Sequence, residues 1–328
     1  MRRREFIAFA GSTAAAWPLA ARAQQRSLPL VGILDQAGLF GAQPEVYRAF
    51  RQGLKEAGFV EGENVAFEYR SAEGLLDRLH VLAADLVRQR VAVIAAPSQA
   101  AALMAKAATA TIPIVFNAGE DPIKLGLVAS LARPEGNLTG INFLVVELAA
   151  KRLELLLELA PGARRLAVLV DPQGGGGTAS AVRELEAAAR SMQLQIQIHN
   201  ASTNREIDAA FVAIARERPD ALVVAAGPFI TSRRVQLSLL AGRLGVPAIY
   251  ANRLLVEAGG LISYGASLTD AIRQMAVYTG RIINGAKPGD LPVVQSSTYE
   301  LVINAQTARI LGLAVPPSLL ARADEVIE

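Results

Sequence analysis

Cysteine is absent from this chain of 328 residues. Its absence excludes disulfide bonds, a thiolate nucleophile, thiolate-bound metals and a lipid anchor attached through cysteine. A two-lobed amino-acid racemase that works with two cysteines is excluded for the same reason. Histidine is nearly absent, since the chain has only His80 and His199, and they lack the spacing of a metal-binding pair. We therefore expect no metal and no cofactor.

The net charge is also small, because the chain has 33 basic and 30 acidic residues. The whole excess lies within residues 1–23, where Arg2, Arg3, Arg4 and Arg22 face Glu5 alone. The rest of the chain is formally neutral, which argues against nucleic acid or an anionic membrane as a partner. Runs of 18 or more uninterrupted apolar residues are missing as well, so we expect no stable membrane insertion.

Residues 1–23 have the layout of an export signal. A basic start is followed by a weakly apolar middle and by Ala21-Arg22-Ala23, a small-x-small cleavage site. The Arg3-Arg4 pair, followed by x-Phe-Ile, resembles the twin-arginine export motif. We predict cleavage near Ala23 and a freely diffusing periplasmic protein, which without cysteine is not a lipoprotein.

From Pro29 onward, short apolar runs alternate with amphipathic stretches. The run Leu30 to Leu34 predicts a buried strand, and the stretch from Pro44 to Ala57 predicts a helix that Gly58 ends. The alternation continues to Phe116 and restarts after Phe143. Solidly apolar strands separated by helices indicate parallel sheets covered on both faces. The fold class is therefore α/β, with two doubly wound parallel-sheet lobes.

In such sheets, ligands bind beyond the carboxyl ends of the strands. The loops after the predicted strands therefore supply the candidate ligand-binding residues. Two lobes joined face to face would enclose a cleft between these loops. The candidates are Asp35, Ser98, Gln99, Asn117, Asp121, Asn142, Phe143, Asp171, Phe229, Tyr250, Asn252 and Tyr264.

Ser98 is the best placed of these residues. It follows a strand through Pro97 and begins a helix, so its hydroxyl and the amides of the first turn suit a carboxylate. The same residue is also an ordinary helix cap. Asn117 and Asp121 come just after the end of a predicted strand, where they serve either a ligand or a turn.

Aromatic residues make up only 5% of the chain, yet several fall in or next to the predicted strand-end loops. They serve either the hydrophobic core or a stacking site for a flat or apolar ligand group. This set comprises Phe40, Phe116, Phe143, Phe229, Tyr250 and Tyr264.

The glycine run from Gly174 to Gly177 formally satisfies a dinucleotide-binding pattern. The next predicted strand ends at His199-Asn200-Ala201, without the acidic residue that would hold a ribose. We therefore interpret the run as a loop at the rim of the cleft.

A series of segments in order along the chain resembles the ABC transporter substrate-binding protein family that includes the tryptophan/tyrosine-binding proteins. These segments are residues 49–58, 61–64 and 68–70, Ile112-Pro113-Ile114-Val115-Phe116, Asp121-Pro122, Gly126-Leu127-Val128, Gly136-Asn137-Leu138-Thr139-Gly140 and Glu300-Leu301-Val302-Ile303-Asn304. The resemblance implies a type I periplasmic-binding fold in which three crossovers join two lobes. Lobe 1 is expected at 24–141 plus 261–294, and lobe 2 at 142–260 plus 295–328.

The resemblance also implies a non-catalytic protein that traps a small solute, amino-acid-like or aromatic, by hinge closure and delivers it to an ABC permease and ATPase. A monomer is expected. Where relatives tend to have Asn-Pro, this chain has Asp171-Pro172 and four glycines, which changes the charge and the side chains of that loop. The open alternatives are a binding module that feeds a sensor kinase or receptor, and an enzyme on a similar two-lobed fold.

Overall fold

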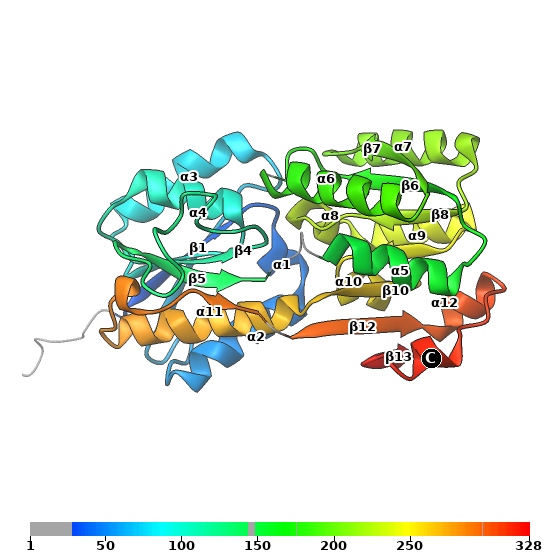
Figure 1. Cartoon of the computed structure of the whole chain (residues 1–328). Coiled ribbons are helices and arrows are strands. Elements are labelled where there is room, and N and C mark those ends of the chain that lie inside the picture. Colours follow the sequence, from blue (N-terminus) through cyan, green and yellow to red (C-terminus); the bar gives the residue numbers. More distant parts are fainter. Residues whose placement is uncertain (1–27, 144–147, 175, 297) are drawn as a thin grey trace, which may run out of the picture.

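The computed structural model describes residues 28–143, 148–174, 176–296 and 298–328. The predicted export signal at 1–23 lies outside the described residues. Figure 1 shows two lobes side by side, each built around its own β-sheet. Each lobe thus has the α/β layering that the alternating sequence pattern predicts.

The sheet of lobe 1 has six strands, all paired in parallel, in the order β11-β5-β4-β3-β1-β2. Its strands are β1 (Leu30–Asp35), β2 (Ala66–Ser71), β3 (Val93–Ala96), β4 (Ile114–Ala118), β5 (Leu138–Asn142) and β11 (Val294–Gln295). Because β1, β3 and β4 run side by side in one direction, their carboxyl ends meet at one edge, and that edge faces lobe 2.

Helices cover both faces of this first sheet. One face is covered by α2 (Pro44–Glu56) and α11 (Leu268–Ile283), the other by α3 (Leu79–Arg88) and α4 (Gln99–Ala108). Figure 1 shows α2 and α11 lying together although they are far apart in the sequence. Pro44 starts α2 at the first helical position, and Gly58 follows its end with φ at 89°, as the sequence predicts.

The sheet of lobe 2 has seven strands in the order β13-β12-β10-β9-β8-β6-β7. They are β6 (Arg165–Val170), β7 (Gln195–Asn200), β8 (Ala221–Val224), β9 (Ala248–Tyr250), β10 (Ile262–Ala266), β12 (Tyr299–Asn304) and β13 (Glu325–Ile327). This sheet is mixed, because β12 pairs antiparallel with β10. The expectation of purely parallel pairing therefore holds only for the first sheet.

Both faces of the second sheet are likewise buried. On one face lie α5 (Ala149–Leu159), α6 (Gly176–Ser191), α12 (Ala305–Ile310) and α13 (Pro317–Leu320). On the other lie α7 (Asn204–Glu217), α8 (Pro228–Ser232), α9 (Arg234–Leu244) and α10 (Arg253–Glu257). Along β6, Leu166, Val168 and Val170 pack on one side while Ala167 and Leu169 pack on the other. The sequence of β6 is apolar at successive positions because both sides of the strand are buried.

The chain passes between the two sheets three times: after β5, between β10 and α11, and between β11 and β12. The sequence-based assignment of residues 261–294 to lobe 1 is wrong for β10, which pairs with β9 and β12 in lobe 2. The second of the three crossings comes after β10, at Ser267, which caps α11. Strand pairing joins residues far apart in sequence, so the local pattern around Leu261 does not reveal which sheet the strand enters.

Three short 3-10 or α-helical segments complete the described fold: α1 (Leu39–Ala42), η2 (Leu76–Arg78) and η4 (Pro288–Asp290). Of these, α1 contacts α8 of the other lobe. Across the described parts of the chain, none of the helices is both long and apolar enough to span a bilayer.

Candidate functional site

Two adjoining cavities lie between the lobes, where the strand-end loops of both sheets meet. Their volumes are about 90 Å³ and 60 Å³, and both are lined by Pro97, Phe143 and residues 226–228. We refer to the two cavities together as the cleft. Their shared lining makes the cleft one continuous candidate site, at the position expected for two facing parallel sheets.

Ser98 and Gln99 line the cleft, as the sequence predicts. Ser98 has an extended backbone, with φ at −145° and ψ at 157°, and caps α4 by accepting a 3.2 Å hydrogen bond from the Ala101 amide. The first-turn amides of a helix have no intrahelical acceptor. The beginning of α4 therefore presents N–H groups and the positive end of the helix dipole to the cleft.

Asn117 lies near the end of β4 and also lines the cleft. Its side chain is 0% exposed, yet neither its Oδ1 nor its Nδ2 has a hydrogen-bond partner among the described residues. An unpaired buried amide costs free energy that a polar ligand group would recover. Asn117 is thus the strongest sign of ligand binding in the cleft.

Phe143 and Asn252 complete the predicted residues that line the cleft. Phe143 contributes to both cavities and follows β5 at the first crossover. Asn252 caps α10 through Leu254, and its Nδ2 donates a 3.1 Å hydrogen bond to Thr231 Oγ1. The Asn252 amide is thereby held in place beside Thr231, which also lines the second cavity.

Four predicted polar residues do not line either cavity, because backbone or neighbouring groups hold their side chains. Asp35 accepts hydrogen bonds from the amides of Ala37 and Phe40 and from the Tyr69 hydroxyl. Asp121 accepts from the Ile123 amide in a turn, and Asn142 is buried in β5. These side chains shape the loops that carry the cleft residues.

Asp171 is the fourth of these residues, and it lies just behind the cleft wall. It is 2% exposed and accepts hydrogen bonds from the Gln173 amide and the Ser202 hydroxyl. Burial raises the pKa of the Asp171 carboxyl above its ordinary value.

The predicted aromatic residues other than Phe143 pack into the protein core rather than lining the cleft. Phe229 and Tyr250 belong to the core on one face of the second sheet. Tyr264 stacks on Tyr299 with their ring centroids 6.3 Å apart. Phe40 and Phe116 are buried in lobe 1. An aromatic residue near a strand end faces the core or the cleft according to the rotation of its strand, which the sequence does not show.

Small residues of lobe 2, which we did not single out from the sequence, form much of the cleft wall. Ala181 comes from α6, and Ala225 and Ala226 follow β8. Gly119 contributes from lobe 1, after β4. The only sequence signal for the lobe 2 residues is their place beside the strand-end loop that contains Gly227 and Pro228. Within the described lining of both cavities, charged side chains are absent.

Polar contacts join the lobes around the cleft. Gln43 Nε2 donates a 3.1 Å hydrogen bond to the Thr231 carbonyl, and Ser180 donates one of 3.1 Å to Glu120. An ion pair of 3.5 Å links Glu45 with Arg234. The lobes are therefore in direct contact, as in a closed binding protein.

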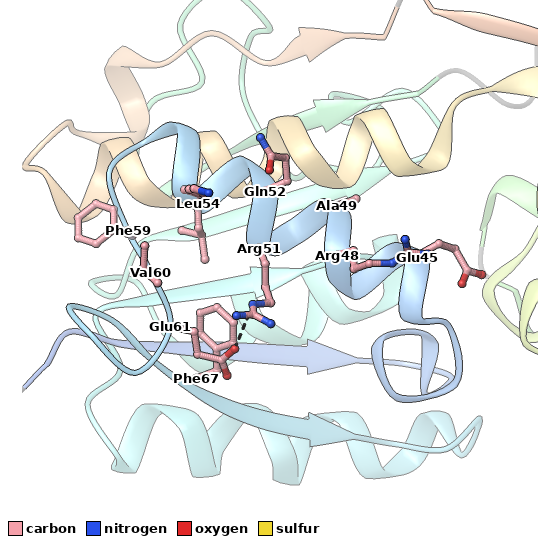
Figure 2. A pocket seen from close by; sticks show the side chains of 11 residues that line it. Glu45, Arg48, Ala49, Arg51, Gln52, Leu54, Phe59, Val60, Glu61 and Phe67 are labelled. Carbon is pink, nitrogen blue, oxygen red and sulfur yellow. Dashed lines mark ion pairs between the residues drawn. The ribbon is translucent and has the colours of Figure 1, made fainter.

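A larger groove of about 570 Å³ lies on the outer surface of lobe 1, along α2 (Figure 2). Figure 2 shows Arg51 directed toward Glu61 across this groove, and their ion pair spans 3.5 Å. The floor contains Leu54, Phe59 and Phe67. The described residues that line the groove include none of the predicted site residues and none from lobe 2. We therefore place the functional site in the smaller cleft, where Asn117 lies.

Known proteins resemble this chain in sequence and in fold. Residues 41–327 match the family model described as ABC transporter substrate binding protein. A tyrosine-binding protein of Clostridioides difficile (strain R20291) is 26% identical over 291 residues, which cover 88% of this chain and 82% of that protein.

Two solved structures resemble this chain over their full length. The ABC domain of a Streptococcus pneumonia protein in complex with L-Trp matches with a TM-score of 0.82 and 25% identity, covering 92% of this chain and 100% of that one. A conserved domain protein of Vibrio cholerae matches with the same TM-score and coverage and 28% identity. These matches show a two-lobed fold like that of the periplasmic binding proteins.

Proposed function

The chain belongs to the ABC transporter substrate-binding protein family, a non-catalytic family, and from this we propose that its cleft captures an amino-acid-like or aromatic solute. The relatives named for tyrosine and solved with L-Trp support this solute class. The observation in this chain that carries the proposal is Asn117, an unpartnered buried amide beside the first turn of α4. The α4 amides suit a carboxylate, and the Asn117 amide suits a polar group next to it.

Solute capture requires the lobes to separate and close again. A solute that contacts both lobes stabilises the closed state by its differential affinity for that state. Ser98 and Asn117 belong to lobe 1, and Thr178 and Asn252 to lobe 2. A solute in the cleft therefore touches both lobes and links binding to closure. We propose that the protein acts as a monomer and that its closed form delivers the solute to the permease and ATPase of an importer.

A thermal-shift screen of the protein without residues 1–23, against amino acids, aromatic acids and unrelated small solutes, tests this function. Specific binding to the folded state raises the melting temperature by mass action. Mass spectrometry of material that co-purifies with the protein checks the result independently. If no small solute shifts the melting temperature and none co-purifies, the proposed capture is wrong.

Replacing Ser98 with alanine is expected to weaken solute binding about tenfold, because the replacement removes a hydrogen-bonding group at the carboxylate end of the cleft. Loss of the cap lowers the stability of the solute-free protein by about 1 kcal/mol. Thr203→Ala is the matched control, since Thr203 caps α7 in the same way, away from the cleft. Calorimetric titration should show a weaker Kd for Ser98→Ala and an unchanged Kd for Thr203→Ala; equal values would remove Ser98 from the site.

We further propose that residues 1–23 export the protein to the periplasm by the twin-arginine route. The double replacement Arg3→Lys and Arg4→Lys is expected to leave uncleaved protein in the cytoplasm, because it keeps the charge but removes the arginine pair. Cell fractionation and N-terminal sequencing measure this outcome. Arg22→Lys, next to the predicted cleavage site, is the control and should still be exported. Periplasmic, processed protein from the double variant would contradict the route.

A further inference from the structure

Two oppositely charged side chains of lobe 2 are buried behind the cleft wall. The first is Arg152 of α5, which is 6% exposed. It lines a cavity of about 30 Å³ that shares Ala181, Ala225 and Ala226 with the cleft. These three small residues therefore belong both to the wall of the cleft and to the wall of the cavity that Arg152 lines.

The second buried charge is Asp171, behind another part of the same wall. A Cβ atom placed on Gly174 would lie 3.5 Å from Asp171 Oδ2, and Gly174 lines the cleft. Thr178, also in the lining, donates a 3.0 Å hydrogen bond to the Asp171 backbone carbonyl. The Asp171 carboxyl therefore lies next to Gly174, and its backbone carbonyl is bonded to Thr178, two residues that line the cleft.

Both groups are held in fixed positions. Arg152 Nε donates a 2.8 Å hydrogen bond to the Tyr264 carbonyl. Burial lowers the pKa of Arg152 to about 10, which leaves it cationic at neutral pH. Asp171 accepts hydrogen bonds from Gln173 and Ser202, and such donors stabilise a carboxylate.

A buried charge acts strongly across one layer of side chains, because little water screens it there. The described lining of the cleft carries no charged side chain of its own. Among the described residues, other charged groups nearby are Glu120 and Arg183, which both hydrogen-bond to Ser180 at the interface between the lobes. Glu206 accepts a hydrogen bond from the Ser202 amide, and its charge also raises the pKa of Asp171. Among the described residues, Arg152 and Asp171 are thus two buried charges that adjoin residues of the lobe 2 wall.

We propose that Arg152 and Asp171 are positioning residues that select a dipolar solute through this wall without touching it. The solute carboxylate lies between the α4 amides and the Ala225–Ala226 wall, and its ammonium group lies beside Gly174 and Thr178. The proposal rests on the proposed function and narrows its solute class to zwitterionic amino acids, in preference to simple carboxylic acids or amines.

The lack of cysteine allows a test that needs no solute. Ala226→Cys and Thr178→Cys each introduce a single thiol into the cleft lining, and the pH dependence of its alkylation rate gives its pKa. A unit charge about 10 Å away, at an effective dielectric constant of about 20, shifts a pKa by about one unit. We expect Arg152→Met to raise the pKa of the thiol from Ala226→Cys by about that amount.

For the thiol from Thr178→Cys, we expect Asp171→Asn to lower the pKa by about one unit. The controls are Arg164→Met and Asp208→Asn, which remove exposed charges outside the described cleft lining and should shift neither thiol. If Arg152→Met does not fold, Arg152→Gln takes its place in the test. Asp171→Asn is expected to fold because asparagine has nearly the same shape as aspartate. Thiol pKa values that do not respond to either replacement would overturn the proposal.

The second part of the test uses L-tryptophan, tryptamine and indole-3-propionate, which carry both charges, only the ammonium, and only the carboxylate. The unaltered protein should bind L-tryptophan at least tenfold more tightly than either analogue. Arg152→Met should remove most of the preference for L-tryptophan over tryptamine. Asp171→Asn should remove most of the preference for L-tryptophan over indole-3-propionate. Unchanged preferences in both variants would also overturn the proposal. If L-tryptophan does not bind at all, the proposed aromatic solute is wrong, while the thiol values still decide this inference.

Discussion

Replacing Gly53 with alanine is expected to destabilise the protein by about 3 kcal/mol, the upper end of what overpacking usually costs. Gly53 lies in α2 where this helix packs against α11. A Cβ atom at this position would lie 2.0 Å from the Arg273 carbonyl oxygen and 2.8 Å from the Ala276 Cβ. The nearest obstacle is backbone, so the two helices must separate to make room. Thermal or denaturant unfolding should show the loss.

Gly242→Ala is the matched control for this prediction. Gly242 lies in α9, and a Cβ atom there would meet nothing within 4 Å. Alanine favours a helix over glycine by about 0.5–1 kcal/mol, so this replacement should stabilise the protein slightly. If alanine lowers the stability at Gly53 but raises it at Gly242, the loss at Gly53 arises from the contact between α2 and α11. A Gly53→Ala variant as stable as Gly242→Ala would contradict the close packing of these helices.

Replacing Asn117 with alanine is expected to weaken solute binding by roughly 10- to 100-fold, because a buried hydrogen bond to a ligand is lost. The solute-free protein should change little in stability. Its buried Asn117 amide has no partner among the described residues, so removing it relieves a desolvation cost that offsets the small cavity left behind. Calorimetric titration and thermal unfolding of the same variant measure the two effects.

Asn137→Ala is the control, because the Asn137 amide has a purely structural use. Its Nδ2 donates hydrogen bonds to the carbonyls of Thr109 at 3.2 Å and Ile112 at 2.7 Å. This variant should lose about 1–3 kcal/mol of stability while its Kd stays unchanged. The two asparagines are therefore expected to behave in opposite ways. Unchanged solute affinity in Asn117→Ala would remove this residue from the binding site.

The candidate site could be predicted from the sequence where local structure decides a side chain's position. Ser98 follows a predicted strand, precedes a predicted helix and caps it, so its place at the strand end is encoded within a few residues. Asn117 could be found by the same rule, because it lies near the end of a buried strand. Phe143 and Asn252 also line the cleft. In each case a strand end delivers the residue to the edge where the lobes meet.

Other candidates depended on information that no short segment contains. Tyr250 also ends a strand, but its ring faces the core of lobe 2. Asp35 ends β1, but its carboxylate accepts hydrogen bonds from the loop that follows. Which face a terminal side chain takes depends on the twist of its strand and on the neighbours packed against it. The Ala225–Ala226 wall was missed because alanine carries no chemical signal in a sequence.

The sequence by itself determined the order of strands and helices, the two-lobed α/β class and the family, because hydrophobic periodicity, caps and motifs are written locally along the chain. Only the tertiary structure decided that β10 joins lobe 2, that the Asn117 amide is buried in the cleft, and that Arg152 and Asp171 lie behind its wall. Each of these features arises from contacts between residues far apart in sequence. The pairing of strands and the packing of side chains select such contacts only when the whole chain has folded.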